Sequence, residues 1–367
     1  MPSRRENSCE DHHMTLEEIQ EYFGARGEER IERTSRRDFL KAASAAALGA
    51  GVLAAGIGAM GGALMPDAHA GEAQRVSTVV RVAHPGAVVE GKPNAELVKR
   101  MVNRSVVLLA GKKDPTAAWK EFFSPKDVVG IKVNGIAGPG LSTNRELVDA
   151  ICRALVEMGV PENNIIIWDN TGGRIENCGY KKNLGETGVR AYNSPDVGYD
   201  EPVRLEKYGK EVRVTRILTE QITALINVPV LKDHSGAGVT FALKNVALGS
   251  TNNPGDLHGN FSLSIPEVNA LEVIRRKHRL IIGDCLLACY NGGPGRNAKF
   301  VWEEKSVMAA TDPVAIDVVA LGIIEAQRKE HGIAPIGRRA DHVQASARFG
   351  LGTADPKSIR LVDEEMT

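Results

Sequence analysis

Apolar strand segments alternate with amphipathic helix segments after about residue 70, and this alternation restricts the folds open to the chain. Residues 127–133 form an apolar strand with a polar end. A helix capped near Asn144 follows to Met158, with apolar residues recurring at helical spacing. Residues 164–169 then read as the next strand. The pattern predicts a strand–helix–strand unit of a parallel sheet.

The same alternation continues to the end of the chain. Further strands are expected over residues 79–83, 212–218, 224–231, 278–284, 306–310 and 359–362, and further helices over 238–249, 266–277, 313–329 and 340–349. Asp312 and Pro313 open the third of these helices with a capping acid and a first-turn proline. The chain is therefore predicted to be an α/β protein: a three-layer, mostly parallel or mixed open sheet with helices on both faces. Residues 71–367 are expected to form a single large domain.

The segment before residue 70 has the pattern of an export signal. Arg36 and Arg37 precede Phe-Leu-Lys and an uncharged Ala/Gly-rich run over 42–65, which ends in Ala68-His69-Ala70. Paired arginines followed by a weakly apolar run predict twin-arginine export, and the small residues predict a cleavage site. Residues 1–70 are thus expected to be a twin-arginine signal peptide with a long leader, recognised by the twin-arginine translocase. The expected location is the periplasm or cell envelope; retention of the run as a membrane anchor is the alternative that the cleavage site disfavours.

Charge and motifs exclude several classes of partner. The chain has 46 basic and 46 acidic residues, of which residues 1–70 contain 8 and 11. The remaining chain therefore has 38 basic and 35 acidic residues, a net charge of +3. So small an excess, with few aromatic residues, argues against nucleic acid as a partner. Gly135–Gly140 follows a predicted strand, but no G-x-G-x-x-G opens a helix there, so there is no nucleotide fingerprint. No phosphate-binding G-x-x-x-x-G-K-[ST] occurs, and the serine elbow G-x-S-x-G is missing.

Polar groups follow several of the predicted strands, where open α/β sheets bind ligands. The strand ends carry Lys132 with Asn134, Asp169, Lys232 with His234, and Asp284, while Lys244 and Asn245 lie in an apolar small-residue helix and His258 in a polar loop. A buried lysine or asparagine is costly unless it is paired or faces a site. An outward-facing Lys244 and hydrogen-bonding loop histidines are the structural alternatives. His278, His331 and His342 adjoin charged helix ends and are expected at the surface.

These residue types suggest roles in a pocket for a small anion. Lys132, Asn134, Asp169, Lys244, Asn245 and Asp284 are the candidates for substrate binding. Lys232, His234 and His258 are the candidates for catalysis, because histidine can move a proton at neutral pH and a nearby lysine can hold an anion.

The cysteines offer a possible metal site. Cys285 and Cys289 stand four residues apart and could share a metal if the segment is helical. A lone C-x3-C lacks the second pair or nearby histidines that complete a zinc or cluster site. Any cofactor is therefore left unknown, with a metal or iron–sulfur cluster possible.

Five segments together resemble the family called domain of unknown function 362. They are residues 129–134, 227–234, 238–245, 292–294 and 311–317, and the likeness extends over about residues 80–363. Members of that family are often exported by the twin-arginine route, and some are fused to ferredoxin-type domains. The four-cysteine repeats of those domains are absent from this sequence, so the resemblance does not imply cluster binding here.

Two hypotheses follow from these observations. The first is a redox- or metal-associated envelope enzyme that acts on a small anionic substrate through the Lys/His/Asn pocket. The alternative is a non-catalytic factor that binds a metal, cluster or anion for assembly of an envelope redox complex. A redox protein of the envelope is a possible partner under either hypothesis.

Overall fold

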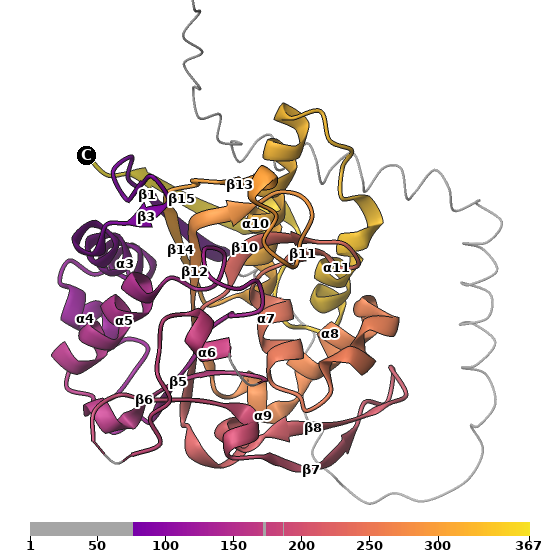
Figure 1. Ribbon diagram of the computed structural model, residues 1–367, viewed down its shortest axis with the longest axis horizontal. Coiled ribbons are helices and arrows are strands. Elements are labelled where there is room, and N and C mark those ends of the chain that lie inside the picture. Colours follow the sequence, from indigo (N-terminus) through magenta and orange to yellow (C-terminus); the bar gives the residue numbers. More distant parts are fainter. Residues whose placement is uncertain (1–75, 172–173, 186) are drawn as a thin grey trace, which may run out of the picture. The chain divides into compact units, whose positions relative to one another are not determined.

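The computed structural model describes residues 76–171, 174–185 and 187–367 (Figure 1). The predicted export signal, residues 1–70, lies outside the described residues, so export, cleavage and membrane anchoring stay predictions. In the ranges that are described, no helix is long and apolar enough to cross a membrane.

A mixed sheet of eleven strands dominates the described residues. Its main path runs β15 (Ile359–Glu365), β1 (Ser77–Ala83), β14 (Ser306–Ala310), β12 (His278–Cys289), β9 (Ala224–Asn227), β4 (Val129–Lys132), β5 (Ile165–Asp169) and β6 (Arg190–Asn193). Neighbours along this path are parallel except β14, which is antiparallel to both β1 and β12. This arrangement confirms the predicted mostly parallel or mixed open sheet.

Three strands extend the sheet away from this path. They are β10 (Val230–His234), parallel to β12; β11 (Gly238–Thr240), antiparallel to β10; and β13 (Val301–Trp302), antiparallel to β12. Two separate hairpins pair β2 (Val88–Val89) with β3 (Lys92–Pro93) and β7 (Tyr199–Arg204) with β8 (Glu211–Thr215).

Helices cover both faces of the sheet. One group comprises α3 (Ala95–Ala110), α4 (Pro115–Trp119) and α5 (Arg145–Glu157); the other comprises α7 (Ala242–Gly249), α8 (Phe261–Ala270), α10 (Pro313–Glu330) and α11 (Asp341–Arg348). Figure 1 shows the strands between these two groups, with the first group in indigo and violet and the second in orange and yellow. Short helices α6 (Arg174–Asn177) and α9 (Glu272–Arg275) lie between longer elements. The three-layer architecture is thus confirmed.

Local sequence signals explain where the two best-predicted helices begin. Asp312 accepts hydrogen bonds from the backbone of Val314 and Ala315, while Pro313 occupies the first turn of α10. Helix α5 begins after Asn144, whose side chain makes no cap hydrogen bond and donates to Asp284 instead. The helix buries Leu147, Ile151 and Leu155 at helical spacing, whereas Val156 is exposed. Both helices bury most of their apolar residues in the core, which supplies most of their stability.

Four predicted segments differ in the structure. The strand expected over 212–218 is β8, which ends at Thr215 and is followed by a helical turn at Ile217–Gln221. The single strand expected over 224–231 is two strands, β9 and β10, because Pro229 interrupts the run and cannot donate to a sheet ladder. The helix expected over 238–249 begins only at Ala242, since Gly238–Thr240 pairs with β10 as β11. The helix expected over 266–277 is the end of α8 followed by α9.

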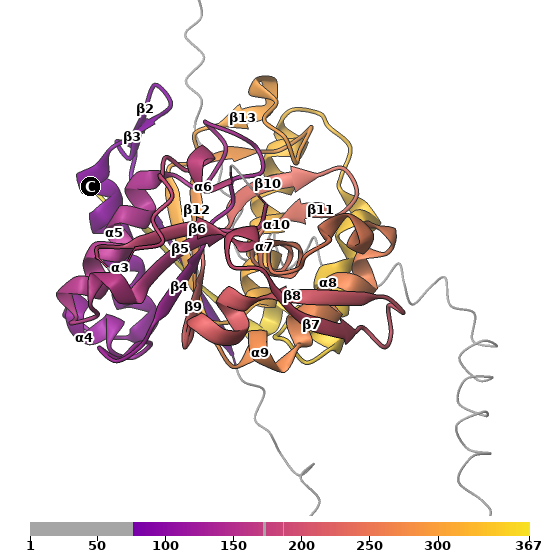
Figure 2. The same cartoon turned by 60° about the horizontal axis from the view of Figure 1, so that its bottom comes forward.

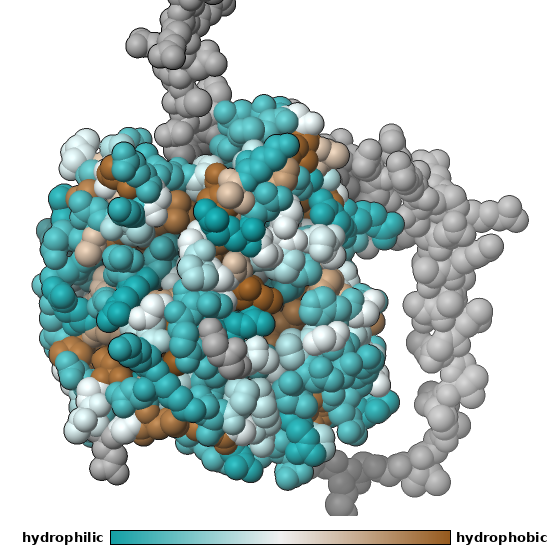
Figure 3. Space-filling view, in the orientation of Figure 1, coloured by the Kyte–Doolittle hydropathy of each residue, from teal (hydrophilic) through white to brown (hydrophobic). Residues whose placement is uncertain are grey.

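The surface is mixed in polarity. Figure 3 shows mostly hydrophilic residues on the visible face, with hydrophobic residues in scattered spots. The exposed large apolar side chains are Val76, Val89, Ile136, Val156, Leu184 and Val203. They belong to separate parts of the sequence, as expected for ordinary surface residues.

Candidate functional site

A small cavity of about 130 Å³ lies beyond the carboxyl ends of β4 and β5. Open α/β sheets bind their ligands at such strand ends. Seven of the nine predicted polar site residues line the cavity: Lys132, Asn134, Asp169, His234, Lys244, Asn245 and His258. We call this cavity the strand-end pocket. Arg174, Asn170 and Pro294 also line it.

Lys132, the last residue of β4, forms a buried ion pair in the wall of the pocket. Its Nζ donates to Asp169 Oδ1 at 2.6 Å and to the carbonyl oxygen of Val133 at 2.7 Å. The other Asp169 oxygen accepts the backbone N–H of Gly135 at 2.7 Å. Gly249 leaves room for this lysine, because a Cβ on Gly249 would lie 2.3 Å from Lys132 Cε. The pair is consequently held in one geometry.

A chain of asparagines and Lys232 continues this network. Asn134 Nδ2 donates to Asn245 Oδ1 at 2.9 Å, and Asn245 Nδ2 donates to Asn227 Oδ1 at 2.8 Å. Lys232 Nζ donates to Asn134 Oδ1 at 2.7 Å. Lys232 is fully buried and does not itself line the pocket, so it acts on the pocket through Asn134. Burial lowers the pKa of Lys232 to about 8, partly opposed by the charge of Asp169.

Lys244 differs from the other two lysines because its ammonium has no such partner among the residues that the structure describes. It lines the pocket with 5% of its surface exposed, and no hydrogen bond or ion pair links its Nζ to another described residue. Its Nζ lies 5.8 Å from the ring centroid of Phe261. Burial, with a smaller contribution from the charge of Lys232, lowers the pKa of Lys244 to about 7. A lysine in these surroundings is readily uncharged near neutral pH.

The two histidines of the pocket hold their ring protons on different nitrogens. His234 Nδ1 accepts the backbone N–H groups of Gly236 and Ala237 at 3.1 and 3.0 Å, so its proton is on Nε2. His258 Nδ1 contacts the carbonyl oxygen of Pro254 at 2.8 Å, which requires a proton on Nδ1. Neutral His258 therefore has its lone pair on Nε2. The ring centroids are 6.0 Å apart, and the pair supplies one donor and one acceptor.

The surroundings of His234 keep it neutral. Burial lowers its pKa to about 3, and the charges of Lys244 and His258 contribute in the same direction. Phe261 packs edge-on against both imidazoles, with centroid distances of 5.6 and 5.0 Å. His234 thus offers a neutral N–H group as a hydrogen-bond donor.

Asp317 of α10 positions the helix that carries Lys244 and Asn245. Its carboxylate oxygens accept the backbone N–H groups of Ala242 and Leu243 at 2.7 and 3.2 Å, at the start of α7. Burial raises the pKa of Asp317 to about 8. Asp317 was not among the predicted site residues, although an acidic residue in the middle of the apolar α10 indicates a buried polar contact. Figure 2 shows α7 and α10 beside one another.

Asp284 lies outside the pocket lining. Its carboxylate accepts the backbone N–H of Asn144 at 2.6 Å and that of Leu286 at 3.2 Å, and the side chain of Asn144 also donates to it. Burial raises its pKa to about 6. These contacts link β12 to the start of α5, so Asp284 has a structural role.

The helical premise for Cys285 and Cys289 is wrong, because both belong to strand β12. The strand is irregular here, because its pairing with β10 shifts register between Asp284 and Cys289. Among the described residues, no three His, Cys, Asp or Glu side chains are grouped to hold a metal. All four described cysteines are free and buried.

The expectation of three surface histidines is wrong for His342. This side chain is fully buried in α11, neither ring nitrogen is hydrogen-bonded to a residue that the structure describes, and burial lowers its pKa to about 3. His278 is partly buried, whereas His331 is exposed and stacks on Tyr290. The charged neighbours in sequence did not reveal that α11 packs against α8.

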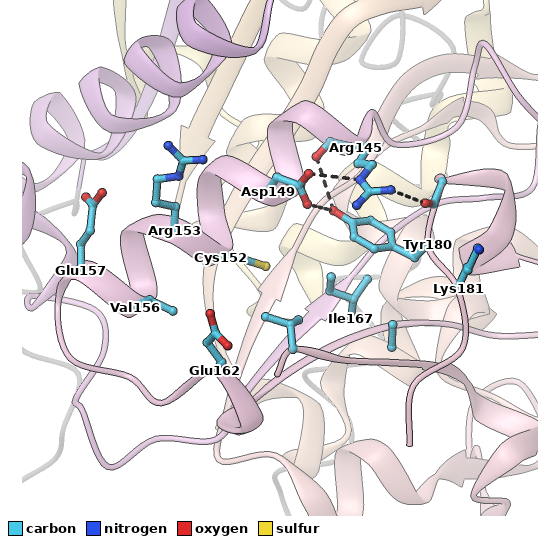
Figure 4. Close-up of a pocket in the computed structure, with 13 residues that line it drawn as sticks. Arg145, Asp149, Cys152, Arg153, Val156, Glu157, Glu162, Ile167, Tyr180 and Lys181 are labelled. Carbon is cyan, nitrogen blue, oxygen red and sulfur yellow. Dashed lines mark hydrogen bonds and ion pairs between the residues drawn. The ribbon is translucent and has the colours of Figure 1, made fainter. Parts of the chain in front are cut away.

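A larger cavity of about 740 Å³ lies over α5 and the β5–β6 side of the sheet (Figure 4). Its polar residues include Arg145, Asp149 and Tyr180, which contact one another: Arg145 pairs with Asp149 at 3.2 Å, and Tyr180 Oη donates to Asp149 at 2.6 Å. None of the nine predicted polar site residues lines this cavity.

The fold and the strand-end pocket define an α/β protein with a polar pocket at the carboxyl ends of a mixed sheet. Residues 129–322, more than half of the chain, match the family described as Domain of unknown function (DUF362), and the chain belongs to this family. The match confirms the resemblance seen in the sequence. Lys132, Lys232, His234, Lys244 and Asp317 all lie within the matched residues.

Other comparisons describe more distant likeness. No curated protein matches the chain. A crystal structure of a protein from Thermotoga maritima aligns with a TM-score of 0.39 and 10% sequence identity, covering 67% of this chain and 61% of that chain. This chain thus spans less than two thirds of the length of that protein.

Proposed function

We propose that this protein is an enzyme that binds a small anionic substrate in the strand-end pocket and moves a proton on it. The observation that carries the proposal is the pair of histidines with opposite hydrogen-bonding roles in a cavity also lined by lysines. An acid–base reaction needs one group that accepts a proton and another that stabilises the charge left behind.

The balance of charge favours an anion. Asp169 neutralises Lys132, whereas Lys244 and Arg174 also line the cavity and Lys232 lies directly behind it. The volume of about 130 Å³ is well below the roughly 300–1,000 Å³ of pockets for drug-sized ligands. A substrate with few carbon atoms and one acidic group fits these conditions.

Each histidine has a distinct role in this proposal. His258 Nε2 takes a proton from the substrate, because its lone pair is free when Nδ1 donates to Pro254. His234 Nε2–H donates to the oxygen on which negative charge develops, as a neutral imidazole can. The asparagine network holds Lys132 and Lys232 in place around them.

The alternative remains a protein that binds an anion without transforming it. The hydrogen bonds that hold Lys132 and Lys232 in place are as compatible with a rigid receptor as with an enzyme. The predicted redox partner, metal association and envelope location belong to either proposal, and no contact among the described residues bears on them.

Two measurements on the 367-residue chain separate these functions. Calorimetric titration with pyruvate, glyoxylate, lactate and phosphate tests anion binding, and proton NMR in D₂O tests exchange of substrate protons. An enzyme binds at least one anion and exchanges its protons, and the His258→Gln variant slows exchange about 100-fold or more. Binding without exchange supports the receptor, and no binding of any anion overturns both.

A further inference from the structure

We propose that Lys244 forms an imine with the carbonyl carbon of a small 2-oxo acid. This inference rests on the proposed function and names the substrate class of the same pocket. It is carried by the position of the Lys244 amine, which differs from that of the other two buried lysines.

Lys244 is the lysine whose nitrogen is available for bonding. Lys132 Nζ is occupied by Asp169 and Val133, and Lys232 Nζ by Asn134. Lys244 faces the same cavity from the fully buried helix α7, and no described carboxylate pairs with it. An ammonium held by a carboxylate cannot attack a carbonyl group, which excludes Lys132. Lys232 does not line the cavity, so Lys244 is the candidate.

The charge state of Lys244 also suits a nucleophile. Burial brings its pKa to about 7, so a substantial fraction of the side chain is a free amine at neutral pH. Desolvation by burial, with a second cation nearby, is a recognised way to activate a lysine. Phe261 and the apolar residues of α7 supply the first condition, and Lys232 supplies the second.

The rest of the pocket fits the other groups of a 2-oxo acid. Arg174 lines the cavity and offers a cation for the carboxylate. His234 Nε2–H can donate to the carbonyl oxygen, which makes the carbonyl carbon a better acceptor for the amine. The small volume admits a short chain beyond these two groups.

The proposed reaction is balanced within the pocket. The lone pair of Lys244 Nζ forms an N–C bond while the carbonyl π electrons move to oxygen, which gains a proton. Nζ loses its protons through His258 Nε2, and the former carbonyl oxygen leaves as water when the C=N bond forms. The overall change is amine plus carbonyl compound to imine plus water, and no oxidant or reductant is needed.

Reductive trapping tests the inference directly. The 367-residue chain is incubated with pyruvate, glyoxylate or 2-oxobutyrate and sodium cyanoborohydride, and the labelled residue is located by peptide mass analysis. We expect at least one acid to label Lys244 in preference to the other lysines. Labelling is expected to reach half its maximum near pH 7 and to be lost in Lys244→Arg, whose fold is checked by circular dichroism and thermal unfolding.

A second variant and the binding data keep the outcomes distinct. Lys181→Arg, at an exposed lysine of the larger cavity, is the matched control and should leave labelling of Lys244 unchanged. If a 2-oxo acid binds and exchanges its protons but Lys244 is not labelled above other lysines, the imine is wrong and the proposed function stands. If none of the three acids labels Lys244 and no anion binds, both proposals fail.

Discussion

The two cavities of this protein differ more in the state of their charges than in their size. The larger one, about 740 Å³, is lined by Arg145 and Asp149, which pair with each other and are about half exposed. The strand-end pocket, about 130 Å³, is lined by an ion pair with almost no exposure, Lys132 with Asp169, and by Lys244, which pairs with no carboxylate in the described part of the chain. Volume alone would select the larger cavity, whereas the state of the charges selects the strand-end pocket.

This difference follows from the dielectric surroundings of each group. Exposed charges are stabilised by water whether or not they pair, so their pairing has little effect on the free energy of unfolding. Buried charges must be paired or must shift their pKa, and an unpaired buried lysine costs stability. Such a cost is typical of functional sites, where perturbed groups are retained for their reactivity. The strand-end pocket has a buried lysine of this kind. In the larger cavity burial raises the pKa of the Cys152 thiol and of the Tyr180 hydroxyl, so that both remain uncharged.

The largest effect that separates the two cavities is expected from Lys132→Met. This change leaves the Asp169 carboxylate buried without its cation. Breaking a buried pair from one side costs about 3–5 kcal/mol, so the free energy of unfolding should fall by about that amount in urea titrations. The double variant Lys132→Met/Asp169→Asn should recover part of the loss. A loss below about 1 kcal/mol would remove the contrast with the exposed pair.

A glycine beside the same lysine gives the next largest effect. Gly249→Ala would put a Cβ 2.3 Å from Lys132 Cε, and the lysine is held by two short hydrogen bonds. Overpacking of this kind costs about 1–3 kcal/mol in the free energy of unfolding. Gly295→Ala is the matched control, because nothing lies within 4 Å of its Cβ position. Equal stability of the two variants in urea would show that Lys132 can move aside.

The third test uses the pH dependence of stability. Between pH 7 and 10.5 the folded protein has lost a Lys244 proton that the unfolded chain retains. The contribution of Lys244 to the free energy of unfolding therefore rises as the pH rises across this window. The same contribution is lost as the pH falls through 7. Lys244→Met should reduce the slope by up to about 1.4 kcal/mol per pH unit, the value for one proton.

The control for this slope comes from the other cavity. Lys181 is exposed there, and the Lys181→Met variant should retain the slope of the parent protein. Urea titrations at several pH values from 7 to 10 measure both variants. A slope that is unchanged by Lys244→Met would mean that Lys244 is fully hydrated in solution, and the argument for its reactivity would be lost.

The sequence predicted much of the fold because its signals were local. The cap at Asp312 and the spacing of apolar residues in 144–158 depend on neighbouring residues, and both helices occur where expected. The division of β9 from β10 and the late start of α7 depend on which strand pairs with which, and periodicity does not contain that information. The strand β12 extends to Cys289 for the same reason, which is why the spacing of the two cysteines was misread.

The candidate site was predictable to a similar degree. Strand ends of a parallel sheet meet at one edge, so Lys132, Asn134, Asp169 and His234 could be grouped before the structure was known. The different positions of the ring proton in His234 and His258 could not be predicted, because they depend on the backbone of two loops. Asp317 was missed because its contact with α7 joins residues 75 positions apart.

The smallest expected effect is that of Arg145→Met in the larger cavity, and it completes the comparison. Arg145 pairs with Asp149 one helical turn away, and both side chains are at least half exposed. Pairs of this kind contribute about 0.3–0.5 kcal/mol, and the loss should shrink further at high salt because exposed charges are screened. Urea titrations at low and high salt measure it against Lys132→Met, whose cost should change little with salt because the Lys132–Asp169 pair is almost fully buried. If both variants responded equally to salt, the buried pair would be screened as strongly as the exposed one, and its charges would be no different in kind from those of the larger cavity.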